Sequence, residues 1–321
     1  MPQTIAPIPR LIYGTAWKKS QTAPLVASAL AAGFRALDTA ASHHYSEEGV
    51  GVGLRQFLSQ SPSPAAHGIT RAGLYIQTKF SPAPSDLPIP DQVHKSIASS
   101  LKNLAVDDKF FAPSPTDSPE AQKKEGDEDF YLDCVLLHAP YPSYKDTLLA
   151  WRALETYVPA RIRTLGISNV DLPDLQRLCD EDAVIKPVVV QNRLNPDEGY
   201  NTPVRVFCRE RGINFQSFWT LTANPRLVRS SFVRQVAKGA GVSDEVAFYG
   251  LVLGLEGVSV LDGTTNEVRM KEDLEGVEKV VAWAGGDGAE VWKESLAALK
   301  AVLVCPGYFL GSSANPLSPE S

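Results

Sequence analysis

The sequence has little cysteine and no long hydrophobic run. Its four cysteines are scattered over 321 residues without C-x-x-C spacing, which excludes a disulfide scaffold and favours reduced thiols. No apolar run approaches the ~20 residues of a membrane span, so we expect no membrane partner. Residues 1–10 contain three prolines and lack the apolar stretch of a secretory signal. Together these absences predict a cytoplasmic location.

An excess of basic charge is also lacking. The chain has 31 Lys and Arg against 37 Asp and Glu, a net charge of −6, and no Lys/Arg block stands out. The electrostatic pattern of a nucleic-acid binder is therefore missing, and we expect no nucleic-acid partner. With 44% hydrophobic and 21% charged residues, the composition is that of a folded protein rather than a disordered or collagen-like chain.

Short β-like runs alternate with helical patterns along the chain. Predicted strands lie at 11–15, 36–39, 74–79, 132–138, 164–168, 188–192, 213–218 and 258–262. Helical stretches between and after them include 25–32, 47–58, 91–104, 147–157, 172–179, 203–211, 244–255 and 289–303. Continuous β-branched runs such as Val188-Val189-Val190 are typical of strands buried on both faces in a parallel sheet.

Eight such strands with intervening helices predict an α/β protein with a single (β/α)8 TIM barrel domain over residues 1–321. A doubly wound open sheet is the alternative, but no G-x-G-x-x-G follows the first strand. Residues 112–129 are polar and rich in helix breakers, so we expect a flexible insertion there, on the barrel face remote from the chemistry. From about residue 305 the chain is expected to be an irregular tail.

Barrel enzymes take their catalytic groups from the C-terminal ends of the strands. Asp38, Lys79 and His138 end predicted strands, and Tyr45 lies in the loop after Asp38. Taken singly, each has an ordinary explanation: a helix cap for the aspartate, packing for the tyrosine, a satisfied core residue for the histidine. A buried lysine is less ordinary, because its ammonium needs a partner.

Together these four residues predict a site that donates a proton. The carboxylate would hold the ammonium, the ammonium would lower the pKa of the phenol from ~10, and the phenol would act as a general acid. The imidazole would orient a carbonyl oxygen and share its developing charge. No zinc-type ligand cluster accompanies them, so we expect no metal. Such a site lacks a reductant, which a bound cofactor would have to supply.

An ordered set of short motifs surrounds these positions. They are GFRALDTA at 33–40, HYSEEGVG at 44–51, QTK at 77–79, LLH at 136–138, LGISN at 165–169, VQN at 190–192, and GTT at 263–265 followed by Arg269 and EDL at 272–274. In this order, from about residue 11 to 274, the set resembles the aldo-keto reductase family. The H-Y-S-E and S-F-W-T-L elements resemble its fungal-type members.

The resemblance implies an NAD(P)H-dependent carbonyl reductase, acting on a small-molecule aldehyde or ketone, and we expect a monomer. Tyr45 would donate the proton, Lys79 and Asp38 would tune it, and His138 would orient the carbonyl. The implied cofactor residues are Ser168, Asn169 and Gln191 at the nicotinamide carboxamide, Phe218 on its ring, Ser217, Thr220 and Leu221 near the pyrophosphate, and Thr264, Arg269, Glu272 and Asp273 at the adenosine end.

The sequence departs from the family pattern in three places. The tyrosine usually comes five residues after the aspartate, where this chain has His43; we assign Tyr45 because its distance to Val50-Gly51 fits the family's tyrosine loop better. Gly263 stands where many relatives have a cation, which removes one partner for a 2′-phosphate. Trp219 replaces a small residue of the cofactor site, where it would narrow the pocket or replace the stacking ring.

The cofactor, the function and the substrate each have an alternative. NADPH is the expected cofactor, with a moderate preference that depends on Arg269, and NADH is the alternative. A regulatory barrel that binds a dinucleotide with little turnover, and a barrel that uses Lys79 as a Schiff-base lysine, are the alternative functions. Trp17, Trp219 and Tyr308 suggest an apolar or aromatic substrate, although surface packing explains each about as well.

Overall fold

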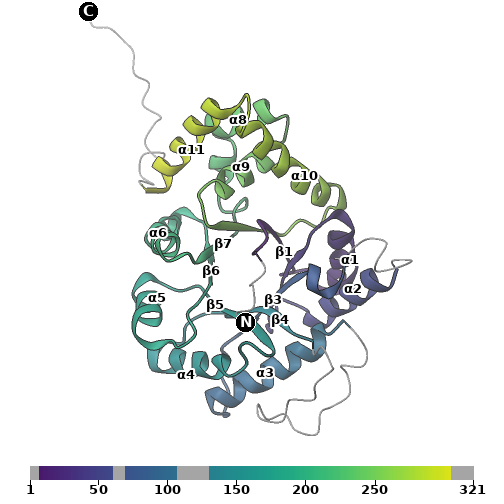
Figure 1. Cartoon of the computed structure of the whole chain (residues 1–321), viewed down its shortest axis with the longest axis vertical. Coiled ribbons are helices and arrows are strands. Elements are labelled where there is room, and N and C mark those ends of the chain that lie inside the picture. The colour runs from purple at the N-terminus through teal and green to yellow at the C-terminus, as the bar shows by residue number, and fades with distance from the viewer. Residues whose placement is uncertain (1–6, 61–68, 107–129, 305–321) are drawn as a thin grey trace, which may run out of the picture.

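In a computed structural model of the chain, eight parallel strands close into a barrel surrounded by helices (Figure 1). The structure describes residues 7–60, 69–106 and 130–304. The expected insertion at 112–129 and the tail from about 305 lie outside the described residues. No helix in the described residues is long and apolar enough to cross a membrane.

Each strand pairs in parallel with the next, and β8 pairs with β1 to close the ring. The strands are β1 Leu11–Gly14, β2 Ala36–Asp38, β3 Tyr75–Phe80, β4 Leu132–Leu137, β5 Ile162–Ser168, β6 Val189–Arg193, β7 Asn214–Phe218 and β8 Val258–Asp262. Every predicted strand is present, and the single-domain (β/α)8 barrel predicted from the sequence is confirmed.

The helices form the outer layer of the barrel. They are α1 Thr22–Ala32, α2 Glu47–Gln60, α3 Ile89–Leu104, α4 Tyr144–Glu155, α5 Leu172–Arg177, α6 Thr202–Arg211, α7 Pro225–Val228, α8 Ser231–Ala240, α9 Asp244–Leu253, α10 Glu267–Ala284 and α11 Ala289–Val304. The sequence stretches named above did not include α7 and α8, so three helices rather than one lie between β7 and β8.

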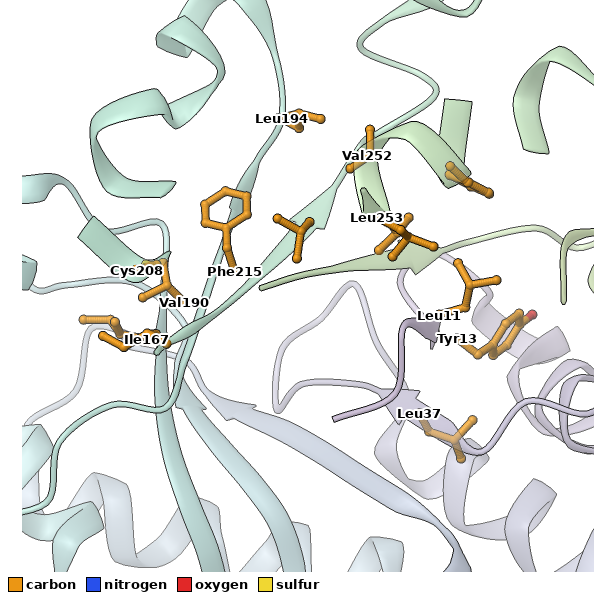
Figure 2. Close-up of a cluster of buried hydrophobic side chains, with 14 of the residues drawn as sticks. Leu11, Tyr13, Leu37, Ile167, Val190, Leu194, Cys208, Phe215, Val252 and Leu253 are labelled. Atoms are coloured by element: carbon orange, nitrogen blue, oxygen red, sulfur yellow. The ribbon is translucent and has the colours of Figure 1, made fainter. Parts of the chain in front are cut away.

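Alternation along the strands separates two buried layers, because successive side chains of a strand point to opposite faces. One set packs between the strands and the helices; Figure 2 shows members of it, among them Tyr13, Val190 and Phe215. A smaller apolar cluster contains Ile12, Tyr75 and other alternate residues of the strands.

Along β3 this second set changes from Tyr75 to the polar side chains of Gln77 and Lys79, all of them buried. β2 and β6 show the same change, from Ala36 to Asp38 and from Val189 to Gln191. Polar groups therefore collect toward the C-terminal ends of the strands, where the sequence predicts the site.

Candidate active site

Asp38 and Lys79 form a buried ion pair at the C-terminal ends of β2 and β3. The ammonium nitrogen lies 2.7 Å from each carboxylate oxygen and 2.9 Å from the backbone oxygen of Thr39. The two side chains are 1% and 0% exposed. Burial alone would lower the pKa of Lys79, but Asp38 and then Tyr45 raise it above its usual value. Lys79 is therefore charged at neutral pH.

The loop after β2 returns Tyr45 to this ion pair. Its ring centroid lies 5.0 Å from the Lys79 nitrogen and 5.9 Å from the His138 ring, which it meets nearly edge-on. His43 is exposed, and its ring lies 3.6 Å from that of His44. The structure therefore places Tyr45 rather than His43 in contact with the ion pair.

The expected lowering of the Tyr45 pKa is not found. Burial raises it, Lys79 lowers it through its charge and a hydrogen bond, and the net result is a pKa above the usual value. The prediction considered the ammonium but not the loss of solvent around the phenol, and here the loss of solvent is the larger effect. Tyr45 consequently holds its proton at neutral pH, which is the state a general acid requires.

His138 follows β4 and faces the same site from the next strand. Its Nδ1 lies 2.6 Å from the hydroxyl oxygen of Ser81, which follows β3. Burial, and then the charge of Lys79, lowers the pKa of His138 to about 4. The imidazole is therefore neutral at physiological pH, with one ring nitrogen protonated and the other an acceptor.

This pKa predicts a loss of stability in acid. Between the unfolded pKa of ~6.5 and the folded value of about 4, the unfolded chain binds more protons at this histidine, so its contribution is present above pH 6.5 and lost as pH falls. The loss amounts to ~3 kcal/mol for a shift of this size. Urea unfolding at neutral and acid pH should show a smaller acid loss for His138→Gln than for the native chain. Equal losses would contradict the burial of a neutral imidazole.

Three of the expected cofactor residues join this group from β5 and β6. Ser168 pairs in register with Gln191 and donates a 2.6 Å hydrogen bond to its backbone oxygen. Asn169 adopts a left-handed conformation, with φ of 52°, and its Nδ2 donates to the backbone oxygen of His138 over 2.9 Å and to Oγ of Ser168 over 3.2 Å. Ser168, Asn169 and Gln191 are thus brought to the same end of the barrel as His138.

Two aromatic rings stand at the end of β7. Phe218 is half-buried, whereas Trp219 is 52% exposed, and the two rings meet nearly edge-on at 6.0 Å. The guanidinium of Arg193 lies 5.5 Å from the first ring and 4.8 Å from the second. Trp219 therefore lies beside Phe218 and is the more exposed of the two rings.

The end of β7 and the loop after it use two hydroxyl groups internally. Ser217 and Thr220 are buried, and their hydroxyl oxygens lie 2.6 Å apart. Leu221 is partly buried against the core. The hydroxyl groups of Ser217 and Thr220 thus hold the turn together, and their contact with a pyrophosphate stays a prediction.

The segment after β8 presents some of the expected adenosine residues and buries one. Arg269 lies in the first turn of α10, as expected, and its exposed guanidinium makes no hydrogen bond or ion pair with other described residues. Glu272 is exposed. The Thr264 hydroxyl oxygen accepts a 3.2 Å bond from the backbone of Asn266.

Asp273 does not face solvent with its neighbours. It is 8% exposed, and burial, followed by the charge of Asp262, raises its pKa. Asp273 is therefore buried beside Asp262, unlike the exposed Glu272, and its contact with an adenosine stays a prediction.

Lys18 is a site residue that the sequence reasoning missed. The residue is 7% exposed, and its ammonium donates a hydrogen bond to the backbone oxygen of Gly263. A side chain built on Gly263 would place its Cβ 4.0 Å from this nitrogen. A cation thus lies next to Gly263, the position where many relatives have one. The available signal was its position in the loop after the first strand.

Comparison with known proteins gives one family. The model of the Aldo/keto reductase family matches residues 123–240, which contain His138, Ser168 and Gln191. The chain is 29% identical over 305 residues to "Glycerol 2-dehydrogenase (NADP(+))" of Hypocrea jecorina, covering 86% of this chain and 90% of that one. It is 29% identical over 257 residues to "Uncharacterized oxidoreductase YtbE" of Bacillus subtilis, covering 79% and 77%.

The chain belongs to the aldo-keto reductase family. A solved aldo/keto reductase from Brucella melitensis shares its fold, with a TM-score of 0.64 and 24% identity over 86% of this chain and 95% of that one. This aldo-keto reductase is accordingly an enzyme, an NAD(P)H-dependent oxidoreductase of carbonyl compounds. The matched family segment begins after Asp38, Tyr45 and Lys79, and the barrel brings those residues to His138.

Proposed function

We propose that this aldo-keto reductase reduces an aldehyde or ketone to an alcohol with NADPH, and that Tyr45 donates the proton. The observation that carries the proposal is the placement of the Tyr45 ring 5.0 Å from the Lys79 ammonium and 5.9 Å from the His138 ring. When bound, NADPH would supply the hydride that reaches the carbonyl carbon. The similarity to a relative named for NADP(+) supports this cofactor.

The roles of the four residues follow from their charges. Asp38 neutralises Lys79, so the resting site carries no net charge from this pair. As the carbonyl oxygen gains negative charge, the phenol of Tyr45 transfers its proton, and the ammonium of Lys79 stabilises the phenolate that remains. His138, neutral at physiological pH, donates an N–H to the same oxygen. Solvent then returns a proton to Tyr45.

The residues at the barrel mouth fit a dinucleotide. Among the described residues, no hydrogen bond ends on Oε1 of Gln191 or Oδ1 of Asn169, so two acceptors are free for a carboxamide. Phe218 offers a ring, and Arg269 offers a guanidinium without a partner among the described residues. Lys18 adds a cation at Gly263.

The geometry argues against a Schiff-base function for Lys79. That chemistry needs a neutral amine that can attack a carbonyl. The ammonium of Lys79 is 0% exposed, is bonded to Asp38, and has a raised pKa, so it is neither neutral nor reachable.

The substrate would be an apolar or aromatic carbonyl. Trp17, 61% exposed, lies with its ring 3.7 Å from that of His44, and Trp219 is 52% exposed, so large rings flank the site. Tyr308, the third aromatic residue expected at the substrate, lies outside the described residues. A panel of aldehydes and ketones, assayed with NADPH and with NADH, tests the proposal; failure of every carbonyl to consume either cofactor would overturn it.

The preference for NADPH should depend on Arg269. A guanidinium can hold a 2′-phosphate through two parallel hydrogen bonds, while Glu272 could instead accept bonds from the hydroxyls of an NADH ribose. We expect NADPH to bind about 10- to 100-fold more tightly than NADH, about 1.4–2.8 kcal/mol. Arg269→Ala should lose most of this difference by weakening NADPH alone.

Lys271→Ala provides the matched control, because Lys271 is an exposed cation on the same helix whose nitrogen lies 3.6 Å from Glu275. It should leave the ratio of the two dissociation constants unchanged. Native protein that binds NADH as tightly as NADPH would show that Arg269 does not select the cofactor.

We also propose that the enzyme acts as a monomer in the cytoplasm. Cys134, Cys179 and Cys208 are buried free thiols, which suits a reducing compartment. Sedimentation at assay concentrations tests the oligomeric state.

A further inference from the structure

Three glutamine side chains lie inside the barrel next to the ion pair. Gln77 on β3, Gln191 on β6 and Gln216 on β7 are 0%, 3% and 0% exposed. Only Gln191 has a role in the proposed function. Burying two further amides is costly unless every polar atom finds a partner, so their arrangement calls for an explanation.

The three amides form a closed network on Asp38. Nε2 of Gln77 and Nε2 of Gln191 donate to the same carboxylate oxygen of Asp38 over 2.6 and 3.0 Å. The same two nitrogens donate to Oε1 of Gln216 over 2.7 and 2.9 Å. Nε2 of Gln216 donates in return to Oε1 of Gln77 over 2.9 Å.

Asp38 determines which way each amide points. The oxygen and nitrogen of an amide have nearly the same shape, so packing alone does not distinguish the two orientations. An ionised carboxylate only accepts hydrogen bonds, and both carboxylate oxygens of Asp38 accept from the ammonium of Lys79 in a buried ion pair. Gln77 and Gln191 must therefore turn their nitrogens to it, and Gln216 must turn its oxygen to both of them.

The network leaves Gln191 with one hydrogen-bonding atom free among the described residues, its Oε1. Both amide hydrogens of Gln191 are used, on Asp38 and on Gln216, and no described residue donates to its Oε1. Toward a ligand, Gln191 is therefore a hydrogen-bond acceptor. Without Gln216 one of its hydrogens loses an acceptor, and the amide is no longer held in a single orientation.

We propose that Gln77 and Gln216 are positioning residues that hold Gln191 as the acceptor for the carboxamide N–H of the nicotinamide cofactor. The inference rests on the proposed function, because it takes a nicotinamide dinucleotide as the ligand. It adds that the selectivity of this end of the site for a carboxamide is built into the barrel interior, behind the residue that meets the ligand.

Equilibrium binding of NADP⁺ and of its 3-acetylpyridine analogue tests the proposal without any turnover. The analogue carries a methyl ketone in place of the carboxamide and has no N–H to donate. Loss of one hydrogen bond corresponds to ~2- to 10-fold in affinity, so native protein should prefer NADP⁺ by about that factor. Quenching of tryptophan fluorescence reports both dissociation constants.

The decisive variant is Gln77→Met/Gln216→Met. It removes both amides that hydrogen-bond to each other, so neither of these two residues keeps a buried amide that has lost the other as its partner. It should bring the ratio of the two dissociation constants close to one, mainly by weakening NADP⁺. Gln216→Glu is the conservative control, because its protonated carboxyl group can accept from Gln191 and donate to Gln77. It should retain the native ratio.

Each outcome decides the matter. A double variant that keeps the native preference, or that weakens both ligands equally, would overturn the positioning role, even if its thermal unfolding midpoint falls. Native protein without any preference for NADP⁺ would overturn it as well. Native protein that binds neither dinucleotide would instead refute the proposed function, and the inference with it.

Discussion

Tyr45→Phe should lower kcat and kcat/KM together by ~10²-fold or more, because it removes the proton donor while keeping the ring. The Tyr45 ring lies 5.0 Å from the Lys79 ammonium, and the raised pKa of its phenol keeps the proton in place until the carbonyl oxygen takes it. NADPH affinity should stay within about a factor of two, since the hydroxyl acts on the substrate. Steady-state kinetics and NADPH titration measure both quantities.

His43→Phe is the matched control for this loop. His43 occupies the position where the family usually has its tyrosine, but it is exposed and lies against His44. Its replacement should change kcat by less than about twofold, because it is remote from the proton transfer. The opposite pattern, a large loss in His43→Phe and none in Tyr45→Phe, would show that the loop has been assigned wrongly.

Lys79→Met should be among the most destabilising single changes in the barrel. It leaves the Asp38 carboxylate buried without a cation, although the amides of Gln77 and Gln191 still donate to it. Breaking a buried pair in this way costs ~3–5 kcal/mol of unfolding free energy. Activity should be lost too, because nothing remains to stabilise the phenolate of Tyr45. Urea unfolding and turnover are the measurements.

Two variants separate the two effects of this change. Asp38→Asn/Lys79→Met removes both charges and should recover much of the stability without recovering turnover. Arg71→Met breaks another largely buried ion pair, in which Arg71 lies 2.8 Å from Asp133. Arg71 precedes β3 and Asp133 lies near the start of β4, so this pair is remote from the C-terminal ends of the strands. Arg71→Met should lower stability and leave kcat unchanged. Full activity in Lys79→Met would contradict the role of the ammonium.

Much of this architecture could be predicted because it is local. Continuous β-branched runs indicate the strands, and a lysine at the end of an apolar strand needs a partner, which the structure supplies as Asp38 for Lys79. The choice of Tyr45 over His43 also came from spacing, and the structure places Tyr45 next to Lys79.

Other features depend on closure of the barrel, which no sequence window contains. Gln77 and Gln216 are 139 residues apart, and nothing near either residue indicates that they exchange hydrogen bonds. Asp273 is buried beside Asp262, and nothing in the sequence around α10 indicates this burial. The net pKa of Tyr45 depends on how much solvent the folded loop excludes, and this too is a property of the closed structure.

The central claim is that this barrel turns over its cofactor rather than only binding it. The most direct test is a stopped-flow single turnover in which protein loaded with NADPH meets the best carbonyl of the substrate panel. The account predicts that NADPH fluorescence disappears as alcohol forms, one NADPH for each alcohol, and that Tyr45→Phe slows this step by ~10²-fold or more. A fluorescence change on NADPH binding, with no NADPH consumed for any carbonyl in the panel, would contradict it and support a dinucleotide-binding regulatory barrel.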